Sequence, residues 1–394
     1  MTTNRISPSA PDELASRVDA AFRQAAAATA APGVQAAVMR QGEVVWTGAH
    51  GLADVAAGTP VTDETMFCLA SFGKLVIAAA ALRQAERGLL DLDAPLRTYL
   101  GDEVPGSSVV TTRMLLTQTA GYPDIYTTPQ VAPLLPYVAP GSTTPSRYDP
   151  DRPFTWSMLA PAYREPVEPG RHWAYSNAGY ILLAQVLVAA LGGEEAMQDA
   201  CSAFIHTPVG IPTIPDRAFT LRRSPDAAAL LARGYDPLAD GSVRDAYDGH
   251  RPRGIPTDLF GLPFGDGMFA GTALGAARFL DGLFVGTAFL HPESIDEMTT
   301  PTPQSLADAD LTKKAHGYGA GTMIEDVARR RWHGHPGMYG GFSSNGATDL
   351  ARGVTVVVLA NGTWLPDEEH PERIETASES VWRALAAACA EAGA

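Results

Sequence analysis

The stretch Phe67-Cys-Leu-Ala-Ser71-Phe-Gly-Lys74-Leu-Val76 decides the fold, because it places a hydroxyl and an amine three residues apart at the start of an apolar run. Positions i and i+3 of a helix share a face, so we expect the side chains of Ser71 and Lys74 to meet at a helix N-terminus. Free N–H groups and the helix dipole favour negative charge there. A serine becomes an effective nucleophile when a base takes its proton, and a desolvated lysine is a suitable base.

Lysine is scarce in this chain, which makes its presence at position 74 informative. It occurs as Lys74, Lys313 and Lys314, whereas lysine and arginine together number 29. Arginine would supply charge at position 74 but does not lose its proton in proteins, so a lysine there indicates that deprotonation matters. The alternative interpretation is a helix-capping serine followed by a surface lysine, since the S-x-x-K pattern is common.

The bulk composition is that of a soluble globular protein with room for two lobes. The chain has 394 residues, of which 45% are hydrophobic and 19% charged. Its net charge of −15 argues against nucleic acids and anionic membranes as partners. No apolar run approaches the roughly 20 residues that span a bilayer, and the first residues lack the apolar segment of a secretory signal. We therefore expect a cytoplasmic protein.

The spacing of the cysteines and of two histidines bears on whether the chain holds a metal. Cys68, Cys201 and Cys389 are odd in number and widely spaced, which favours reduced, buried thiols over disulfides or a metal site. His333 and His335 are spaced to share one face of a strand, but no carboxylate or cysteine motif accompanies them. We expect neither a metal nor a cofactor.

The predicted elements run in the order helix, strand pair, long helical middle, three to four strands, and final helix. A hairpin around Gln41-Gly42 joins the first two strands. The first strands can join the last ones only if the middle is an insertion into one antiparallel sheet. Helices are predicted near 11–30, 71–88, 111–120, 181–191, 274–284 and 371–390, and strands near 34–40, 43–49, 319–325, 330–335, 341–348 and 353–360.

We therefore predict an α+β fold, with an antiparallel sheet flanked by the N- and C-terminal helices and a large, mostly helical insertion. Residues 1–70 and 315–394 form the predicted sheet lobe, and residues 71–314 form the helical lobe. The segment 126–169 is rich in proline and aromatic residues and has little periodicity, so we expect an ordered lid there rather than a disordered loop. A nucleophile where the lobes meet would lie in a natural cleft.

Five motifs lie in one order along the chain and together resemble a known superfamily. They are S-x-x-K at 71–74, an LLTHTSG-like stretch at 114–123, PG…YSNxGY at 168–180, a GGGL-like turn at 265–271 and GHxGxxxGF at 334–342. The sequence is thus similar to the serine β-lactamase and penicillin-binding-protein superfamily. Within it, the match is to the branch of class C β-lactamases, family VIII esterases, D-aminopeptidases and small-molecule transacylases. The resemblance implies the β-lactamase-like fold.

The resemblance also implies catalytic roles. Ser71 is the acyl-accepting nucleophile, Lys74 its base, and Tyr175 a second proton shuttle on the other side of Ser71. Asn177 orients Lys74 and the substrate amide, and His335 takes the lysine position of the third motif. Considered without the resemblance, Tyr175 would be interpreted as a core aromatic residue.

Further positions complete the implied site. The backbone N–H groups of Ser71 and Met338 form the oxyanion hole, and two such donors stabilise a tetrahedral intermediate by several kcal/mol. Gly337 belongs to the substrate-binding strand. Trp156 and Trp173 are candidates for lining the acyl pocket, although ordinary packing is an equally good interpretation of buried aromatic residues.

The third motif departs from the K-T-G of β-lactamases. Here it is His335-Pro336-Gly337, which removes the fixed charge and the hydroxyl that help to hold a substrate carboxylate. Proline lacks an N–H, so we expect its strand to be an edge of the sheet. These changes argue against β-lactam hydrolysis and against D-Ala-D-Ala chemistry.

We expect a serine acyl-enzyme catalyst that acts on a small-molecule ester or amide. The lid favours transfer of the acyl group to an amine or alcohol over transfer to water, as in a transacylase of specialised, antibiotic-type metabolism. A carboxylesterase or a D-amino-acid amidase or peptidase is the alternative. A hypothesis of another class is a non-catalytic binding scaffold, which the intact Ser71, Lys74 and Tyr175 argue against.

Overall fold

The computed structural model describes most of the chain in eleven stretches. These are residues 10–134, 155–206, 219–220, 230–238, 242–246, 265–267, 269–286, 290–308, 311, 315–365 and 375–391. The central part of the expected lid, residues 135–154, lies outside the described residues. Its described flanks hold short helices at Ile125–Thr127, Ala132–Leu134, Trp156–Leu159 (α5) and Ala160–Ala162.

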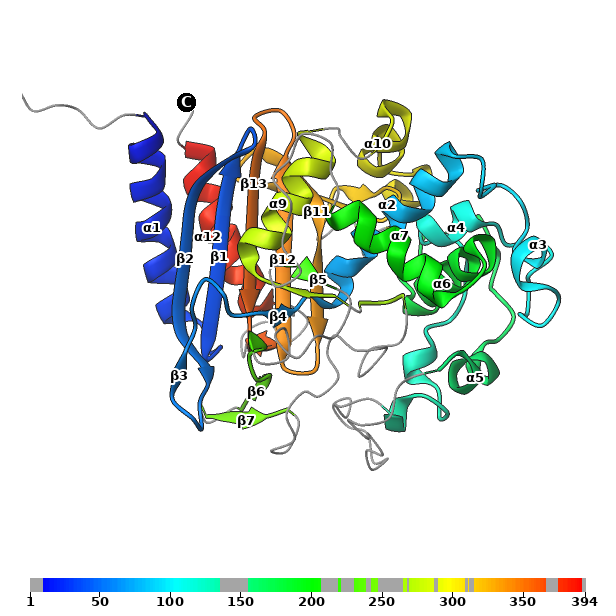
Figure 1. The fold of residues 1–394 in the computed structure, drawn as a ribbon, viewed down its shortest axis with the longest axis horizontal. Coiled ribbons are helices and arrows are strands. Elements are labelled where there is room, and N and C mark those ends of the chain that lie inside the picture. Colours follow the sequence, from blue (N-terminus) through cyan, green and yellow to red (C-terminus); the bar gives the residue numbers. More distant parts are fainter. Residues whose placement is uncertain are drawn as a thin grey trace, which may run out of the picture.

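One eight-stranded antiparallel sheet forms the centre of the first lobe (Figure 1). Strands from the start of the chain pair directly with strands from its end, as Val38 opposite Val356 shows. The middle of the chain is therefore an insertion into one sheet, and the predicted α+β fold is confirmed. In sheet order the strands are β3 (Thr59–Pro60), β2 (Glu43–Asp54), β1 (Gly33–Arg40), β13 (Val354–Ala360), β12 (Phe342–Asp349), β11 (Arg330–Tyr339), β10 (Met323–Val327) and β9 (Gly317–Tyr318).

The central strand β13 is buried on both faces, which explains its nearly continuous apolar sequence. Every residue of β13 is buried. Because successive side chains of a strand point to opposite faces, Val356 and Val358 pack on one side while Val357 and Leu359 pack on the other. The hairpin between β1 and β2 turns at Gln41-Gly42, where φ is 51° and 87°, as a two-residue turn of type I′ requires.

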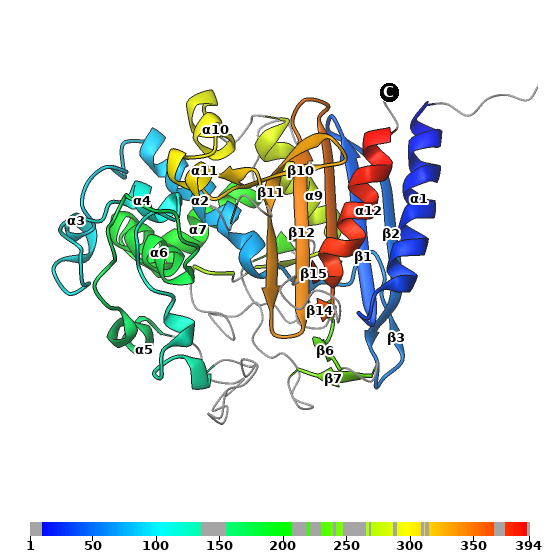
Figure 2. The ribbon, with the colours of Figure 1, turned by 180° about the vertical axis from the view of Figure 1, so that it is seen from behind.

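Helices cover both faces of this sheet (Figures 1 and 2). The terminal helices α1 (Ala10–Ala28) and α12 (Ala377–Glu391) lie side by side on one face, as expected. On the other face, α9 (Ala273–Phe284) packs against β1 and β13. The expected division of the chain placed α9 in the helical lobe, and the structure corrects this, because α9 is part of the sheet lobe.

The second lobe is built around two helices that are buried nearly all round, α2 (Gly73–Glu86) and α6 (Asn177–Leu191). Such helices belong to a lobe interior. Among the described residues no single helix is long and apolar enough to cross a membrane. Helix α6 and the following segment Glu194–Cys201 would together be long and apolar enough, but the two are bent by 105° relative to each other. Smaller helices surround α2 and α6: α3 (Arg97–Leu100), α4 (Thr112–Leu116), α7 (Glu194–His206), α10 (Pro292–Thr299) and α11 (Pro303–Ala307).

Three smaller sheets of short strands accompany the main sheet in the described residues. β4 (Phe67–Cys68) pairs with β8 (Ala270–Gly271), which also pairs with β5 (Phe219–Thr220). Two further pairs are β6 (Tyr235–Pro237) with β7 (Val243–Asp245) and β14 (Trp364–Leu365) with β15 (Glu375–Thr376). The three cysteines are buried and free.

Replacement of Trp382 by alanine tests how much α12 stabilises the sheet. Its ring is fully buried, lies 5.5 Å from the Trp332 ring between centroids, and its Nε1–H donates to the carbonyl of Val356 at 3.1 Å. Trp382→Ala should lower the free energy of unfolding by about 3–5 kcal/mol in urea titrations. Trp382→Phe, which keeps an aromatic ring, should cost less. A loss below about 1 kcal/mol in the alanine variant would contradict this packing.

Candidate active site

Ser71 lies in a tight turn that connects β4 to α2. Residues Ala70–Phe72 form one turn of 3₁₀ helix, and α2 begins at Gly73, two residues later than Ser71. Ala70 has φ of 48°, an unfavourable backbone conformation for alanine that occurs at functional turns. The side chain of Ser344 on β12 donates to the carbonyl of Leu69 at 2.7 Å and holds the turn against the sheet. The serine is thus placed at the junction of the two lobes.

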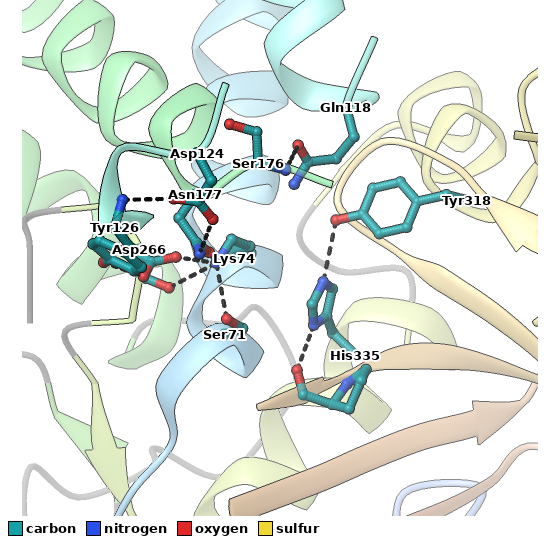
Figure 3. Close-up of polar contacts among 11 residues, drawn as sticks. Ser71, Lys74, Gln118, Asp124, Tyr126, Ser176, Asn177, Asp266, Tyr318 and His335 are labelled. Carbon is teal, nitrogen blue, oxygen red and sulfur yellow. Dashed lines mark hydrogen bonds and ion pairs between the residues drawn. The ribbon is translucent and has the colours of Figure 1, made fainter. Parts of the chain in front are cut away.

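Lys74 is one turn further along and has no exposed surface. Its Nζ lies 2.9 Å from Ser71 Oγ, 2.9 Å from Asn177 Oδ1 and 3.1 Å from the backbone carbonyl of Asp266 (Figure 3). It also forms an ion pair with the carboxylate of Asp266. The structure therefore brings together the expected serine, lysine and asparagine, and it adds an aspartate.

Asp266 is a residue of the site that its sequence context does not reveal. It stands in the turn Gly265-Asp-Gly267, where an aspartate is normally interpreted as turn-forming. The structure buries its side chain beside Lys74, and Tyr126 donates a hydrogen bond to its second oxygen, Oδ2, at 2.5 Å. The signal available in the sequence was the replacement of a small residue by a carboxylate in a GGGL-like turn.

A second carboxylate, Asp124, lies behind Asn177. The amide Nδ2 of Asn177 donates to Asp124 Oδ2 at 2.8 Å, which sets the orientation of its Oδ1 towards Lys74. Burial raises the pKa of Asp124, and the neighbouring charge of Asp266 adds to this effect, while a backbone hydrogen bond from Tyr126 opposes it. Asn177 thus connects Lys74 to a carboxylate that does not touch it.

Tyr175 approaches Ser71 from the other side. Its hydroxyl is hydrogen-bonded to Ser71, and its ring centroid lies 5.2 Å from Lys74 Nζ. Burial raises the pKa of Tyr175 well above its usual value, and the negative charge of Asp266 raises it further. The segment is held by Gln118, whose Oε1 accepts from the N–H of Ser176 at 3.0 Å and whose carbonyl accepts from the N–H of Ala174 at 2.9 Å.

His335 is neutral and both of its ring nitrogens are engaged. Burial, assisted by the charge of Lys74, lowers its pKa to about 3. Nδ1 therefore donates to the Pro336 carbonyl at 2.6 Å, and the hydroxyl of Tyr318 donates to Nε2 at 3.2 Å (Figure 3). The position that carries a lysine in β-lactamases supplies no charge here.

The strand that carries Pro336 is an edge along only half of its length. β11 pairs with β10 as far as Gly334 and with β12 through to Tyr339. Pro336 thus lies beyond the pairing with β10, where its missing N–H leaves no hydrogen bond unmade. The expectation of an edge strand was wrong for β11 as a whole and holds locally at the proline.

One cavity of about 570 Å³ contains most of the expected site residues. Lys74 lies behind its wall, in contact with Ser71. Trp156 is not among the lining residues, and its ring instead packs 5.6 Å from that of Tyr163 between centroids. The expectation that Trp156 lines the acyl pocket was therefore wrong, because its ring packs against Tyr163 instead. The expected residues that line the cavity are Ser71, Trp173, Tyr175, Asn177, His335, Gly337 and Met338.

A pH titration of stability tests the buried histidines. Burial lowers the pKa of His333 to about 4 from 6.5, so below pH 6.5 the unfolded chain binds a proton that the folded chain refuses. Stability from this residue is complete above pH 6.5 and is lost as the pH falls, by about 2 kcal/mol between pH 7 and pH 5. His333→Gln should remove that part of the slope in urea titrations at the two pH values. Equal slopes in both proteins would contradict the assignment.

Comparisons with known proteins agree with this geometry. The beta-lactamase family model matches residues 18–378. Esterase EstB of Burkholderia gladioli is 29% identical over 386 residues, which cover 92% of this chain and 95% of that protein. The D-amino acid amidase of Ochrobactrum anthropi SV3 has a TM-score of 0.72 at 23% identity, with 95% of this chain and 98% of that one covered. EstCE1, a hydrolase with promiscuous acyltransferase activity, has a TM-score of 0.69 at 20% identity, with 96% and 99% covered.

The superfamily resemblance inferred from the motifs is thus confirmed. The family match begins in the first helix, runs through both lobes and ends in the last helix. All five motifs fall inside it, and the esterase matches over nearly the whole of both chains. We conclude that this chain belongs to the beta-lactamase family and is an enzyme of its serine hydrolase type.

Proposed function

We propose that the protein transfers acyl groups from a small-molecule ester or amide through an acyl-enzyme on Ser71. One observation carries this proposal: Ser71 Oγ lies 2.9 Å from a fully buried lysine amine and beside the hydroxyl of the half-buried Tyr175, at the wall of a cavity of about 570 Å³. A nucleophile held by a base that is oriented by further groups is the arrangement that covalent catalysis needs. A non-catalytic ligand-binding scaffold does not require a nucleophile with an oriented base.

The roles follow from the contacts. Ser71 attacks the substrate carbonyl and loses its proton towards Lys74. The backbone N–H groups of Ser71 and Met338 receive the oxyanion, which is supported by the close passage of β11 beside the Ser71 turn. Tyr175 stays protonated and donates to the departing alcohol or amine, and Asn177 keeps Lys74 aimed at the serine.

The charges around the cavity favour substrates without a carboxylate. His335 is neutral, and the guanidinium of Arg383 is held by Glu325 at 3.1 Å and Glu379 at 2.8 Å. Burial raises the pKa of Glu325 to about 7, although Arg383 opposes this shift. No fixed cation among the described lining residues is thus left to anchor an anion as the lysine of K-T-G does. We therefore expect β-lactams to be poorer substrates than simple esters and amides.

Transfer to an amine or alcohol is the finer proposal, as in a transacylase of specialised, antibiotic-type metabolism. The rings of Tyr126, Trp173 and Tyr339 line the cavity and give an organic acceptor apolar surface to pack against. Water gains nothing from such contacts, so they favour an organic acceptor over water. EstCE1 demonstrates that this fold serves a hydrolase with promiscuous acyltransferase activity. Hydrolysis is the second candidate, since EstB is an esterase and the Ochrobactrum protein a D-amino acid amidase.

Intact-protein mass spectrometry tests the acyl-enzyme. Brief incubation with p-nitrophenyl esters of graded acyl length should add one acyl group to the wild type and none to Ser71→Ala. Added amine or alcohol should clear the adduct faster than water if the protein is a transacylase. Clearance that no tested acceptor accelerates would identify a hydrolase. Absence of both adduct and ester turnover across all acyl lengths would overturn the proposal.

Gly337→Ala tests the proposed oxyanion site. A Cβ at this position would lie 2.4 Å from the Leu69 carbonyl oxygen and 2.9 Å from the backbone nitrogen of Ser71, so either β11 or the turn must shift. Displacing one oxyanion donor should slow acylation about 100- to 1,000-fold. The matched control is Gly179→Ala on α6, where the new Cβ meets its neighbours at 3.8 Å or more. Equal acylation rates in the two variants would contradict the placement.

A further inference from the structure

We propose that Asp266 is the terminal proton acceptor of Ser71, reached through Lys74. This inference rests on the proposed acyl-enzyme function and adds a residue to its mechanism. Asp266 touches Lys74 and acts on Ser71 only through it, so it is a positioning residue. Three features of the site support this proposal: the acceptors around Lys74, the burial of the pair, and the hydrogen bond from Tyr126.

The first feature is that Lys74 has more acceptors than hydrogens. An ammonium group has three N–H donors and no acceptor. Four oxygens surround this one, namely Ser71 Oγ, Asn177 Oδ1, and the carbonyl and one carboxylate oxygen of Asp266. A charged Lys74 therefore has no lone pair for the serine proton. It can take that proton only while it gives another one away.

The second feature is that Asp266 is the acceptor placed for that proton. Its side chain is 5% exposed and that of Lys74 is fully buried, so no bulk water contacts the amine. Of the four oxygens, the carboxylate is the one that gains a stable O–H on protonation. The Asn177 amide and the Asp266 carbonyl are far weaker bases, which leaves one route for the proton.

The step balances in atoms and charge. The Ser71 Oγ–carbon bond forms as the carbonyl π bond opens, and the negative charge passes to the substrate oxygen. The Oγ proton moves to Lys74 Nζ while a different proton moves from Nζ to the Asp266 carboxylate. Lys74 stays an ammonium group, and Asp266 becomes a neutral acid. When the intermediate collapses, the bond to the leaving group breaks and Tyr175 gives its proton to that group. Asp266 then returns one proton through Lys74 to Tyr175, so both side chains regain their starting states.

The third feature is the hydrogen bond from Tyr126 to the other carboxylate oxygen, at 2.5 Å. Burial and the charge of Asp266 raise the pKa of Tyr126 well above its usual value, so it remains a donor at neutral pH. It fixes the carboxylate plane and leaves Oδ1 to Lys74. The other described titratable groups that interact with the Lys74–Asp266 pair are Cys68, Asp124, Tyr163, Tyr175, Tyr180, Tyr318 and His335.

This proton transfer from Ser71 through Lys74 to Asp266, here called the relay, predicts a pH dependence of acylation that a purely structural role of Asp266 does not. With the relay, the amine keeps its charge throughout and no proton has to leave the site before acylation, so the wild-type rate should be flat from pH 5 to pH 8. Without the carboxylate, the Lys74 amine has to lose a proton to solvent first. In Asp266→Asn the acylation rate should therefore rise with pH, by about tenfold per pH unit.

The experiment measures pre-steady-state acylation by a p-nitrophenyl ester from pH 5 to pH 8. Asp266→Asn should lose at least about 100-fold at pH 7, as for a general base. The matched control is Asp281→Asn, which alters a carboxylate on α9 that is equally buried, and it should keep the wild-type rate and profile. A rate for Asp266→Asn equal to or above wild type, or a lower rate with an unshifted profile, would overturn the relay.

Tyr126→Phe keeps the proposal testable should Asp266→Asn fail to fold. Loss of the hydrogen bond leaves the carboxylate plane free to turn away from Lys74, so acylation at pH 7 should slow about tenfold. A wild-type acylation rate would contradict the relay. Failure of the wild type itself to form an adduct would instead remove the proposed function and the relay together, whereas an adduct with unchanged variants removes only the relay.

Discussion

The active site depends on one physical constraint, the burial of a charged amine. Removing an ammonium group from water costs several kcal/mol unless protein atoms replace its hydration. Lys74 meets this requirement with acceptors from three separate segments: Ser71 before α2, Asn177 at the start of α6, and Asp266 in the turn before β8. Because each acceptor must stay within hydrogen-bond distance, the amine fixes the relative positions of all three segments.

The sheet lobe completes the site through two connections. Pairing of β4 with β8 sets Cys68 opposite Ala270, which brings the Ser71 turn close to the Asp266 turn although about 200 residues separate them in sequence. The bond from Ser344 to the Leu69 carbonyl then holds β12, and through strand pairing its neighbour β11, against the same turn. The insertion of the helical lobe into one sheet is therefore what allows the nucleophile, its amine and the substrate strand to converge.

Local sequence patterns predicted the parts of this structure that local physics determines. The terminal helices, the Gln41-Gly42 hairpin and the apolar strands follow from periodicity and turn chemistry. The Ser71–Lys74 contact follows from helical spacing. By contrast, α9 is apolar enough to suit either lobe, and only long-range pairing assigns it to the sheet. The packing of Trp156 on Tyr163 is equally non-local, so an aromatic residue near the cleft could not be assigned to a pocket.

Asp266 was missed for a different reason, which lies in the electrostatics of the whole site. A single aspartate in a glycine-rich turn has a sufficient local explanation, and only the fold shows it to be buried against the lysine. Burial, assisted by the charge of the same lysine, lowers the pKa of His335, so the third motif carries no charge. One ammonium group thus has two unlike neighbours: a carboxylate on the helical side, which pairs with it, and a neutral histidine on the strand side, which adds no second positive charge.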